Sequence, residues 1–96
     1  MAQVSLSNAA LDDLKSIFDH ISIDSEYYAE KVINKILQRI TILETQIRIG
    51  KPVPEFENDL IREILEGHYR IIYKIENEYN VSIARIYHGA RLLKNL

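Results

Sequence analysis

The residues best suited to chemistry lie near the end of the chain, in the run Tyr87-His88-Gly89-Ala90-Arg91. A histidine close to an arginine could bind and polarise a phosphate group, and the imidazole could carry a proton between reacting atoms. His88 could at least as readily be a hydrogen-bonded or surface residue at the end of a strand. His20 lies among carboxylates and His68 lies in a predicted turn, so we expect both to be solvated.

Basic residues of the predicted strands form a second group of candidates. Arg62, Arg70 and Lys74 would form one cationic patch if the strand register brings them together. The alternative is a solvated face on which Glu63 and Glu76 balance these cations, and the sequence leaves both interpretations open. The candidates for binding a target or a phosphate are Arg62, Arg70, Lys74, Arg85 and Arg91.

Motifs of other known chemistries are absent from the sequence. There is no H-E-x-x-H pair, no glycine-rich phosphate loop, no G-x-S-x-G turn and no cluster with metal-ligand spacing. Without cysteine there is neither a thiolate nucleophile nor a disulfide. Asp12, Asp13, Asp24 and Glu26 stand where helices are predicted to begin, and we interpret them as helix-start carboxylates. We therefore expect no metal and no cofactor.

The chain that must position these residues is predicted to be one small domain, residues 1–96. Its 47% apolar residues suffice for one core, and its charges sum to −2. That sum hides an asymmetry, because residues 1–60 carry six basic and ten acidic side chains whereas residues 61–96 carry six and four. An anionic partner would therefore bind the second part. Neither a secretory signal nor a membrane span is visible, which predicts a cytoplasmic protein without membrane contact.

Apolar residues of the first half recur every three or four positions and predict two amphipathic helices. An extended segment at residues 3–6 comes first, and Ser7 or Asn8 then caps a helix of about four turns. We expect Asp24 to cap a second, longer helix that continues until Gly50 and the prolines after it. The short link between the two helices predicts an antiparallel hairpin.

After the linker 50–59 the apolar period shortens to about two, which predicts strands at residues 61–65, 69–75 and 81–87. Short turns between them predict an antiparallel meander whose buried face packs on the helical hairpin. Alternation along the middle strand assigns to this face Tyr69, Ile71, Tyr73 and Ile75. The third strand alternates imperfectly, as a bulge would explain. The apolar residues of segment 89–96 predict a short C-terminal helix. The fold class is therefore α+β.

Three runs of residues occur in a characteristic order: Ile61-Arg62-Glu63-Ile64, Tyr69-Arg70-Ile71-Ile72-Tyr73 and Ile86-Tyr87-His88-Gly89-Ala90-Arg91. Together with the preceding short strand and helical hairpin, they resemble the RelE/ParE superfamily of bacterial type II toxins. The resemblance covers nearly the whole chain. It implies a compact α+β toxin that a cognate antitoxin neutralises.

The resemblance implies one of two targets. RelE-like toxins cleave messenger RNA on the ribosome, and their catalytic roles would fall on Arg70, Arg91, His88 and Tyr87. ParE-like toxins, found in plasmid stabilisation systems, inhibit DNA gyrase and are not nucleases. We favour the ParE-like branch, because a net negative charge disfavours docking on ribosomal RNA. The alternatives are a RelE-like nuclease and a protein that has lost toxicity but still binds an antitoxin.

Antitoxins of this superfamily bring a partly disordered tail that folds on binding. Exposed aromatic and leucine side chains are the candidate contacts for such a tail: Tyr27, Tyr28, Phe56, Tyr79, Leu92, Leu93 and Leu96. The alternative, above all for the leucines, is that these side chains complete the core. DNA would be contacted only indirectly, through the antitoxin.

Overall fold

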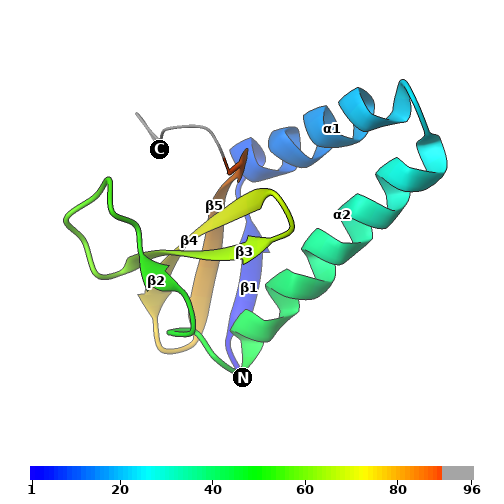
Figure 1. The fold of residues 1–96 in the computed structure, drawn as a ribbon. Coiled ribbons are helices and arrows are strands. Elements are labelled where there is room, and N and C mark those ends of the chain that lie inside the picture. Colours follow the sequence, from blue (N-terminus) through cyan, green and yellow to red (C-terminus); the bar gives the residue numbers. More distant parts are fainter. Residues whose placement is uncertain (90–96) are drawn as a thin grey trace.

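Two helices and a five-stranded sheet make up the computed structural model, which describes residues 1–89 (Figure 1). In chain order the elements are β1 (Gln3–Leu6), α1 (Asn8–Ser22), α2 (Glu26–Ile40), a 3₁₀ helix η1 (Thr41–Glu44), β2 (Lys51–Pro52), β3 (Ile61–Glu66), β4 (Tyr69–Asn77) and β5 (Asn80–His88). The predicted α+β class is confirmed. The predicted C-terminal helix lies outside the described residues.

The sheet has the strand order β1-β5-β4-β3-β2. β3, β4 and β5 form the predicted antiparallel meander, and β1 pairs in parallel with β5 at one edge. β2 pairs antiparallel with β3 at the other edge, inside the segment that the sequence predicts to be a linker. A two-residue strand is too short to leave a periodic signal, so sequence patterning could not find it.

Serine side chains cap both helices. Ser7 accepts a hydrogen bond from the Ala10 amide at 3.0 Å, as predicted, whereas Ser25 and not Asp24 caps α2 by accepting from the Tyr28 amide at 3.1 Å. The prediction of a helix continuing to Gly50 is wrong, because α2 ends at Ile40 and tightens into η1. This tighter turn still buries Leu43 and lets the Glu44 carbonyl accept from the Ala2 amide at 2.8 Å.

The core lies between the helical hairpin and the face of the sheet turned towards it, here called the inner face. Ile71, Tyr73 and Ile75 of β4 are buried there, together with apolar residues of β5 and of both helices. Tyr69 packs against the same cluster, so the predicted core face is confirmed. The opposite side of the sheet is called the outer face.

A bulge in β5 explains its imperfect alternation. Ile72 pairs with Arg85 but Tyr73 pairs with Ile83, so Ala84 is the extra residue. Because of this extra residue, Ile83 and Ile86, which are three positions apart, both face the inner core. The Ala84 carbonyl accepts a hydrogen bond from the Ser7 hydroxyl at 2.8 Å, which ties the bulge to the start of α1.

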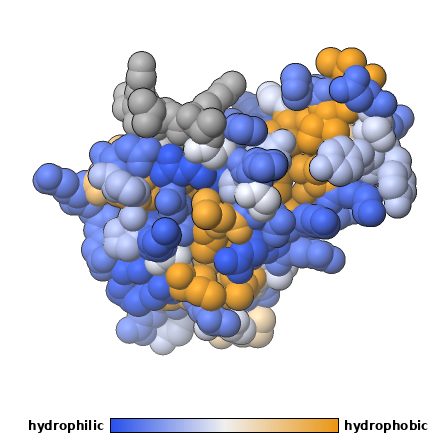
Figure 2. All heavy atoms as spheres, in the orientation of Figure 1, coloured by the Kyte–Doolittle hydropathy of each residue, from blue (hydrophilic) through white to orange (hydrophobic). Residues whose placement is uncertain are grey.

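The helical hairpin projects beyond the sheet, and the turn between α1 and α2 lies at its far end (Figure 1). Hydrophobic atoms reach the surface at this end, where Ile23 is 80% exposed (Figure 2). Within residues 1–89, neither helix combines the length and the apolar character needed to cross a membrane.

Candidate functional site

Most of the candidate residues of the strands share the outer face. Arg70, Ile72 and Lys74 alternate along β4 on this side, since their neighbours Ile71 and Tyr73 lie in the inner core. Across the ladder, β5 places Tyr87 opposite Arg70 and Arg85 opposite Ile72. The register therefore brings one tyrosine and three cations to the same surface.

Residues 53–59, which follow β2, cross the outer face and are called the strap. Val53 and Ile72 are fully buried against each other, and the partly buried Phe56, Ile61 and Tyr87 pack around them. The sequence predicts only a linker in this place. The strap instead builds a second, small core on the side of the sheet that the helices leave uncovered.

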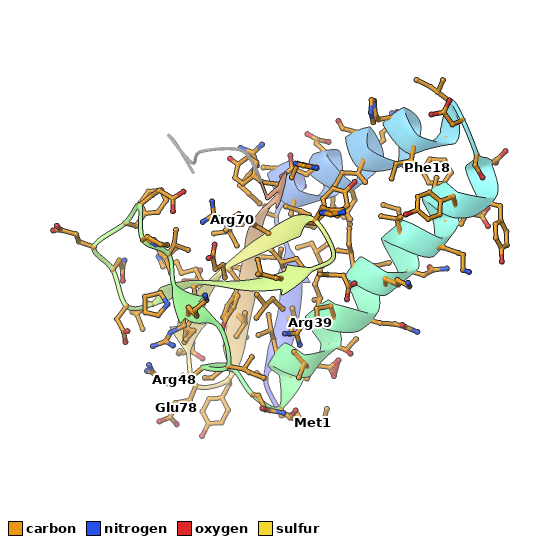
Figure 3. The ribbon with its side chains drawn as sticks, in the orientation of Figure 1. Met1, Phe18, Arg39, Arg48, Arg70 and Glu78 are labelled. Atoms are coloured by element: carbon orange, nitrogen blue, oxygen red, sulfur yellow. The ribbon has the colours of Figure 1, made fainter. Side chains whose placement is uncertain are left out.

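Arg70 is held at the centre of this surface by two carboxylates. Its Nε donates to Glu63 Oε2 at 2.6 Å, and its two terminal nitrogens donate to the Glu55 carboxylate at 2.9 and 3.1 Å. The residue is only 9% exposed and extends from β4 on the side where the strap lies (Figure 3). The hydrogen bond to Glu55 raises the pKa of Arg70, as does Glu63, although burial opposes this shift. Arg70 is therefore a buried cation that its two partners compensate.

The cationic patch predicted as one interpretation is not formed. Arg62 pairs with Tyr73, so its side chain starts from the inner side of the sheet, where it donates to the Gly50 carbonyl at 2.8 Å and to Asp59 at 2.9 Å. Lys74 remains about half exposed, 3.9 Å from Glu76. The second interpretation is right about Glu63 and Glu76 as partners but wrong about solvation, because Arg70 is buried beneath the strap.

Asp13 of α1 organises the other end of the outer face. Its carboxylate accepts from Arg85 Nε at 2.8 Å, from an Arg85 terminal nitrogen at 2.9 Å and from the Ile86 amide at 2.8 Å. The hydrogen bond to Asp13 raises the pKa of Arg85. The Arg85 guanidinium also lies 4.6 Å from the centroid of the Tyr87 ring. The interpretation of Asp13 as a helix-start carboxylate is therefore wrong, since it joins α1 to β5.

His88 lies on the inner side of the sheet, away from Arg70. It pairs with Tyr69 across the ladder, meets the Tyr69 ring edge-on at 5.8 Å and stacks on His68 at 6.1 Å. Burial raises the pKa of the Tyr69 phenol. His68 and His20 are exposed, as predicted. The structure thus joins Tyr87, and not His88, to Arg70, while Arg91 lies outside the described residues.

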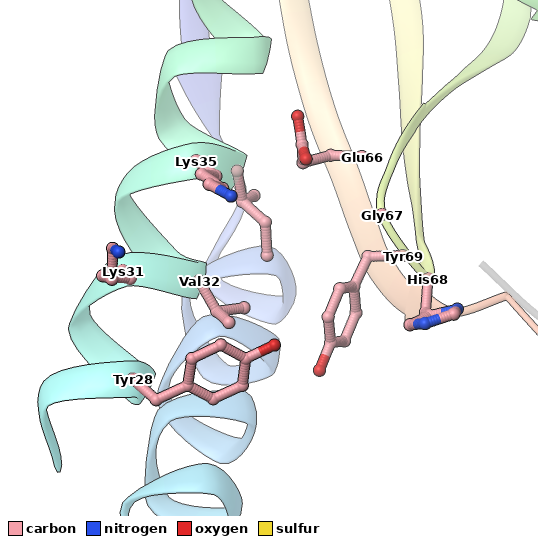
Figure 4. A pocket seen from close by; sticks show the side chains of 9 residues that line it. Tyr28, Lys31, Val32, Lys35, Glu66, Gly67, His68 and Tyr69 are labelled. Atoms are coloured by element: carbon pink, nitrogen blue, oxygen red, sulfur yellow. The ribbon is translucent and has the colours of Figure 1, made fainter. Parts of the chain in front are cut away.

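The candidate antitoxin contacts separate into three groups. Tyr27, Tyr28 and Tyr79 are 71%, 58% and 68% exposed, Phe56 is partly buried in the strap, and Leu92, Leu93 and Leu96 lie outside the described residues. A cleft opens beside Tyr28, between α2 and the turn that joins β3 to β4 (Figure 4). Lys31, Val32 and Lys35 line its α2 side, and residues 66–69 line the other.

Comparison with known proteins decides the family. The model of the ParE toxin of the type II toxin-antitoxin system parDE matches residues 4–93. The chain belongs to the ParE toxin family. None of the curated proteins compared with the chain matches it.

Solved structures that share the fold include two toxin-antitoxin systems. One, described as the chromosomal ParDE toxin-antitoxin system from P. aeruginosa, has a TM-score of 0.75 and 20% identity, covering 92% of this chain and 96% of the other. The other, the RelBE2 toxin-antitoxin complex from Mycobacterium tuberculosis, has a TM-score of 0.65 and 23% identity, covering 91% and 96%. At these identities the two likenesses show the fold alone, and membership of the ParE toxin family rests on the family model.

In this ParE-family chain, sequence reasoning missed the two carboxylates that organise the outer face. Glu55 stands in a proline-containing linker and Asp13 in an amphipathic helix, so neither position carries a local signal of its partner. Within residues 1–89, no group of three or more histidine and carboxylate side chains is arranged to hold a metal ion. What the outer face offers is two organised cation–carboxylate clusters and a stacked tyrosine.

Proposed function

We propose that this ParE-family toxin inhibits DNA gyrase by protein–protein contact and that a cognate antitoxin neutralises it. The observation that carries the proposal is the state of Arg70. Glu55 and Glu63 bind the guanidinium of this buried residue, so a phosphate could reach it only by displacing a carboxylate. A toxin that acts through protein contact needs no such phosphate site. The cytoplasm is the location that this target requires.

The ribosome-dependent nuclease remains the alternative because Arg70 and Tyr87 lie opposite each other on one face. Arg70 would bind the phosphate, and Tyr87 would serve as acid or base; Arg91 and His88 are the other candidates for that chemistry. His88 extends from the other face, and the net charge of −2 gives little attraction to ribosomal RNA. Both features support the gyrase proposal over the nuclease.

For the antitoxin we propose the cleft beside Tyr28 as one contact region. Lys31 and Lys35 flank it, and Val32, Ile36 and Tyr69 supply apolar surface, a combination suited to an amphipathic segment with acidic residues. Tyr27 is exposed next to Tyr28 at the start of α2, whereas Tyr79 is exposed in the turn between β4 and β5. The remaining candidates are Phe56 and the three C-terminal leucines. DNA would be reached only through the antitoxin.

The decisive experiment adds purified protein to purified gyrase and relaxed plasmid, and in parallel to ribosomes carrying a defined message. We expect supercoiling to be inhibited and the message to stay intact, because the proposed contact is with the enzyme and not with RNA. Unchanged supercoiling at a large protein excess, together with cuts at fixed codon positions, would reverse the assignment to the nuclease.

Induction of the gene without its antitoxin tests toxicity itself. We expect arrested growth with DNA breaks and an SOS response, whereas translation arrest alone would point to the ribosome. If growth is unaffected and both purified assays are negative, the chain is an antitoxin-binding protein without toxicity, and the proposed function is wrong.

A further inference from the structure

The strap is attached to the rest of the chain mainly by side chains. One backbone hydrogen bond joins its first residue to β3, from the Val53 amide to the Ile61 carbonyl at 3.1 Å. The bond from the Phe56 amide to the Val53 carbonyl is internal to the strap, and the bond from Ile61 to the Asn58 carbonyl closes its far end. A surface segment with so few backbone bonds to its support opens at a lower free energy than the strands beneath it.

Three side chains of the strap contact the outer face in a regular order. Val53 is buried against Ile72, Glu55 binds Arg70 through both carboxylate oxygens, and Phe56 packs on the same small core. The bond from the Phe56 amide to the Val53 carbonyl makes this stretch a turn, which presents an apolar residue, a carboxylate and a second apolar residue to the sheet. Side chains presented together in this way are anchors of the kind by which a peptide is bound in a groove. The strap therefore occupies this face as a bound peptide would.

The receiving surface is built by parts of the fold other than the strap. Glu63 of β3 holds Arg70 Nε at 2.6 Å, so the guanidinium keeps its orientation when the strap is absent. Glu55 now accepts from both terminal nitrogens, one of which also contacts Glu63, so a carboxylate that replaced Glu55 would meet the same donors. Ile72 is fixed in the sheet, and Tyr87 is stacked under Arg85, which Asp13 holds in turn. A surface that is already ordered loses little free energy on binding.

We propose that the strap is a displaceable internal ligand, and that the outer-face surface beneath it binds a turn-forming segment of a partner protein with a carboxylate between apolar side chains. The binding surface consists of Arg70, Ile72, Ile61 and Tyr87. Because the strap is tethered, it competes at a high effective concentration, so the intact protein binds such a segment weakly until the Glu55–Arg70 contact is broken. This surface is distinct from the α2 cleft and does not depend on gyrase being the target.

The first test measures whether Glu55 holds the strap closed. Glu55→Gln removes the charge from the contact, and Glu57→Gln, two residues along the strap, makes the same chemical change at an exposed position. By hydrogen exchange, we expect the Val53 amide, whose bond to the Ile61 carbonyl joins the strap to β3, to exchange about tenfold faster in Glu55→Gln and unchanged in Glu57→Gln, since a charged hydrogen bond is lost. The β4 amides should keep their protection in both variants. Equal Val53 exchange in both variants would overturn the proposal.

The second test uses the strap as its own probe. A fluorescein-labelled peptide of residues 51–59, capped at both ends, is titrated against wild type, Glu55→Gln and the double variant Val53→Ala/Glu55→Gln. We expect the peptide to bind the single variant at least about tenfold more tightly than wild type, because the internal competitor is weakened. Its affinity for the double variant should be higher still. If the double variant does not fold, the single variant decides.

A peptide carrying glutamine in place of its central glutamate is the matched control. We expect it to bind the open variants several-fold more weakly, because it cannot supply the carboxylate that Arg70 receives. Equal binding of the two peptides, or no gain over wild type, would overturn the proposal whatever the result with gyrase.

Discussion

The buried hydroxyl of Tyr73 joins the sheet to the segment that leads into β2. It donates to the Ile47 carbonyl at 2.8 Å and accepts from the Gly50 amide at 3.0 Å. Gly50 lies so close that a Cβ there would stand 2.6 Å from this hydroxyl. Tyr73→Phe leaves two backbone groups without this partner and should lower the free energy of unfolding by about 1–3 kcal/mol, measured by urea denaturation. Tyr79→Phe is the exposed control, and equal midpoints for the two variants would contradict this role.

The hydroxyl of Tyr73 also makes the stability of the fold depend on pH in the alkaline range. Burial raises the pKa of Tyr73 above its usual value, so the folded protein keeps a proton that the unfolded chain loses above pH about 10. The stability that this raised pKa contributes is complete below that pH and is lost as the pH rises through the pKa of Tyr73 in the folded protein. We expect urea midpoints of the wild type to fall between pH about 9 and 11, and those of Tyr73→Phe to fall less. Parallel declines would assign the effect to other groups, Tyr69 first.

Single residues also define what the sequence could predict. Alternation is a local signal, so it placed Tyr73 and its neighbours on the core face. It could not pair Tyr73 with Gly50 or Arg70 with Glu55, because both partners lie in an aperiodic segment whose path depends on the finished sheet. The candidate site residues could therefore be predicted from their residue types, whereas the residues that bind them could not.

At the scale of elements, the contact of α1 with the β5 bulge fixes the outer face. Asp13 accepts from the Ile86 amide at 2.8 Å and from Arg85. Asp13→Ala removes these acceptors and should lower the free energy of unfolding by about 1–3 kcal/mol, whereas Asp12→Ala, the exposed neighbour, should change it by less than about 0.5 kcal/mol. Chemical denaturation of both variants measures this difference. An equal loss in both would mean that α1 stabilises β5 by apolar packing alone.

Elements with a strong period were predicted with nearly correct bounds. The three long strands and α1 belong to this class, and even the bulge left a trace in the alternation of β5. α2 was predicted too long because Leu43 and Ile47 continue the apolar pattern into the core after the helix has tightened into η1. Tertiary packing, and not helix propensity, sets that end.

At the scale of the whole molecule, one inner core crosses every layer. Leu14 of α1, Ile36 of α2 and Ile71 of β4 belong to the same buried cluster, and β1 closes the edge beside β5. The helical hairpin has no second core of its own among residues 1–89, so it cannot remain folded once the sheet is lost. Helices and sheet should therefore unfold in one cooperative transition.

Two circular-dichroism signals test this prediction in a single urea titration. The signal at 222 nm follows α1 and α2, and the near-ultraviolet tyrosine band follows the packing of Tyr73 and Tyr69 in the sheet. Their midpoints should coincide, and Tyr73→Phe and Asp13→Ala should shift the 222 nm midpoint although neither substitution breaks a bond within a helix. A helical signal that outlasts the tyrosine band would mean that the hairpin is an independent unit, with the sheet and its strap folding onto it afterwards.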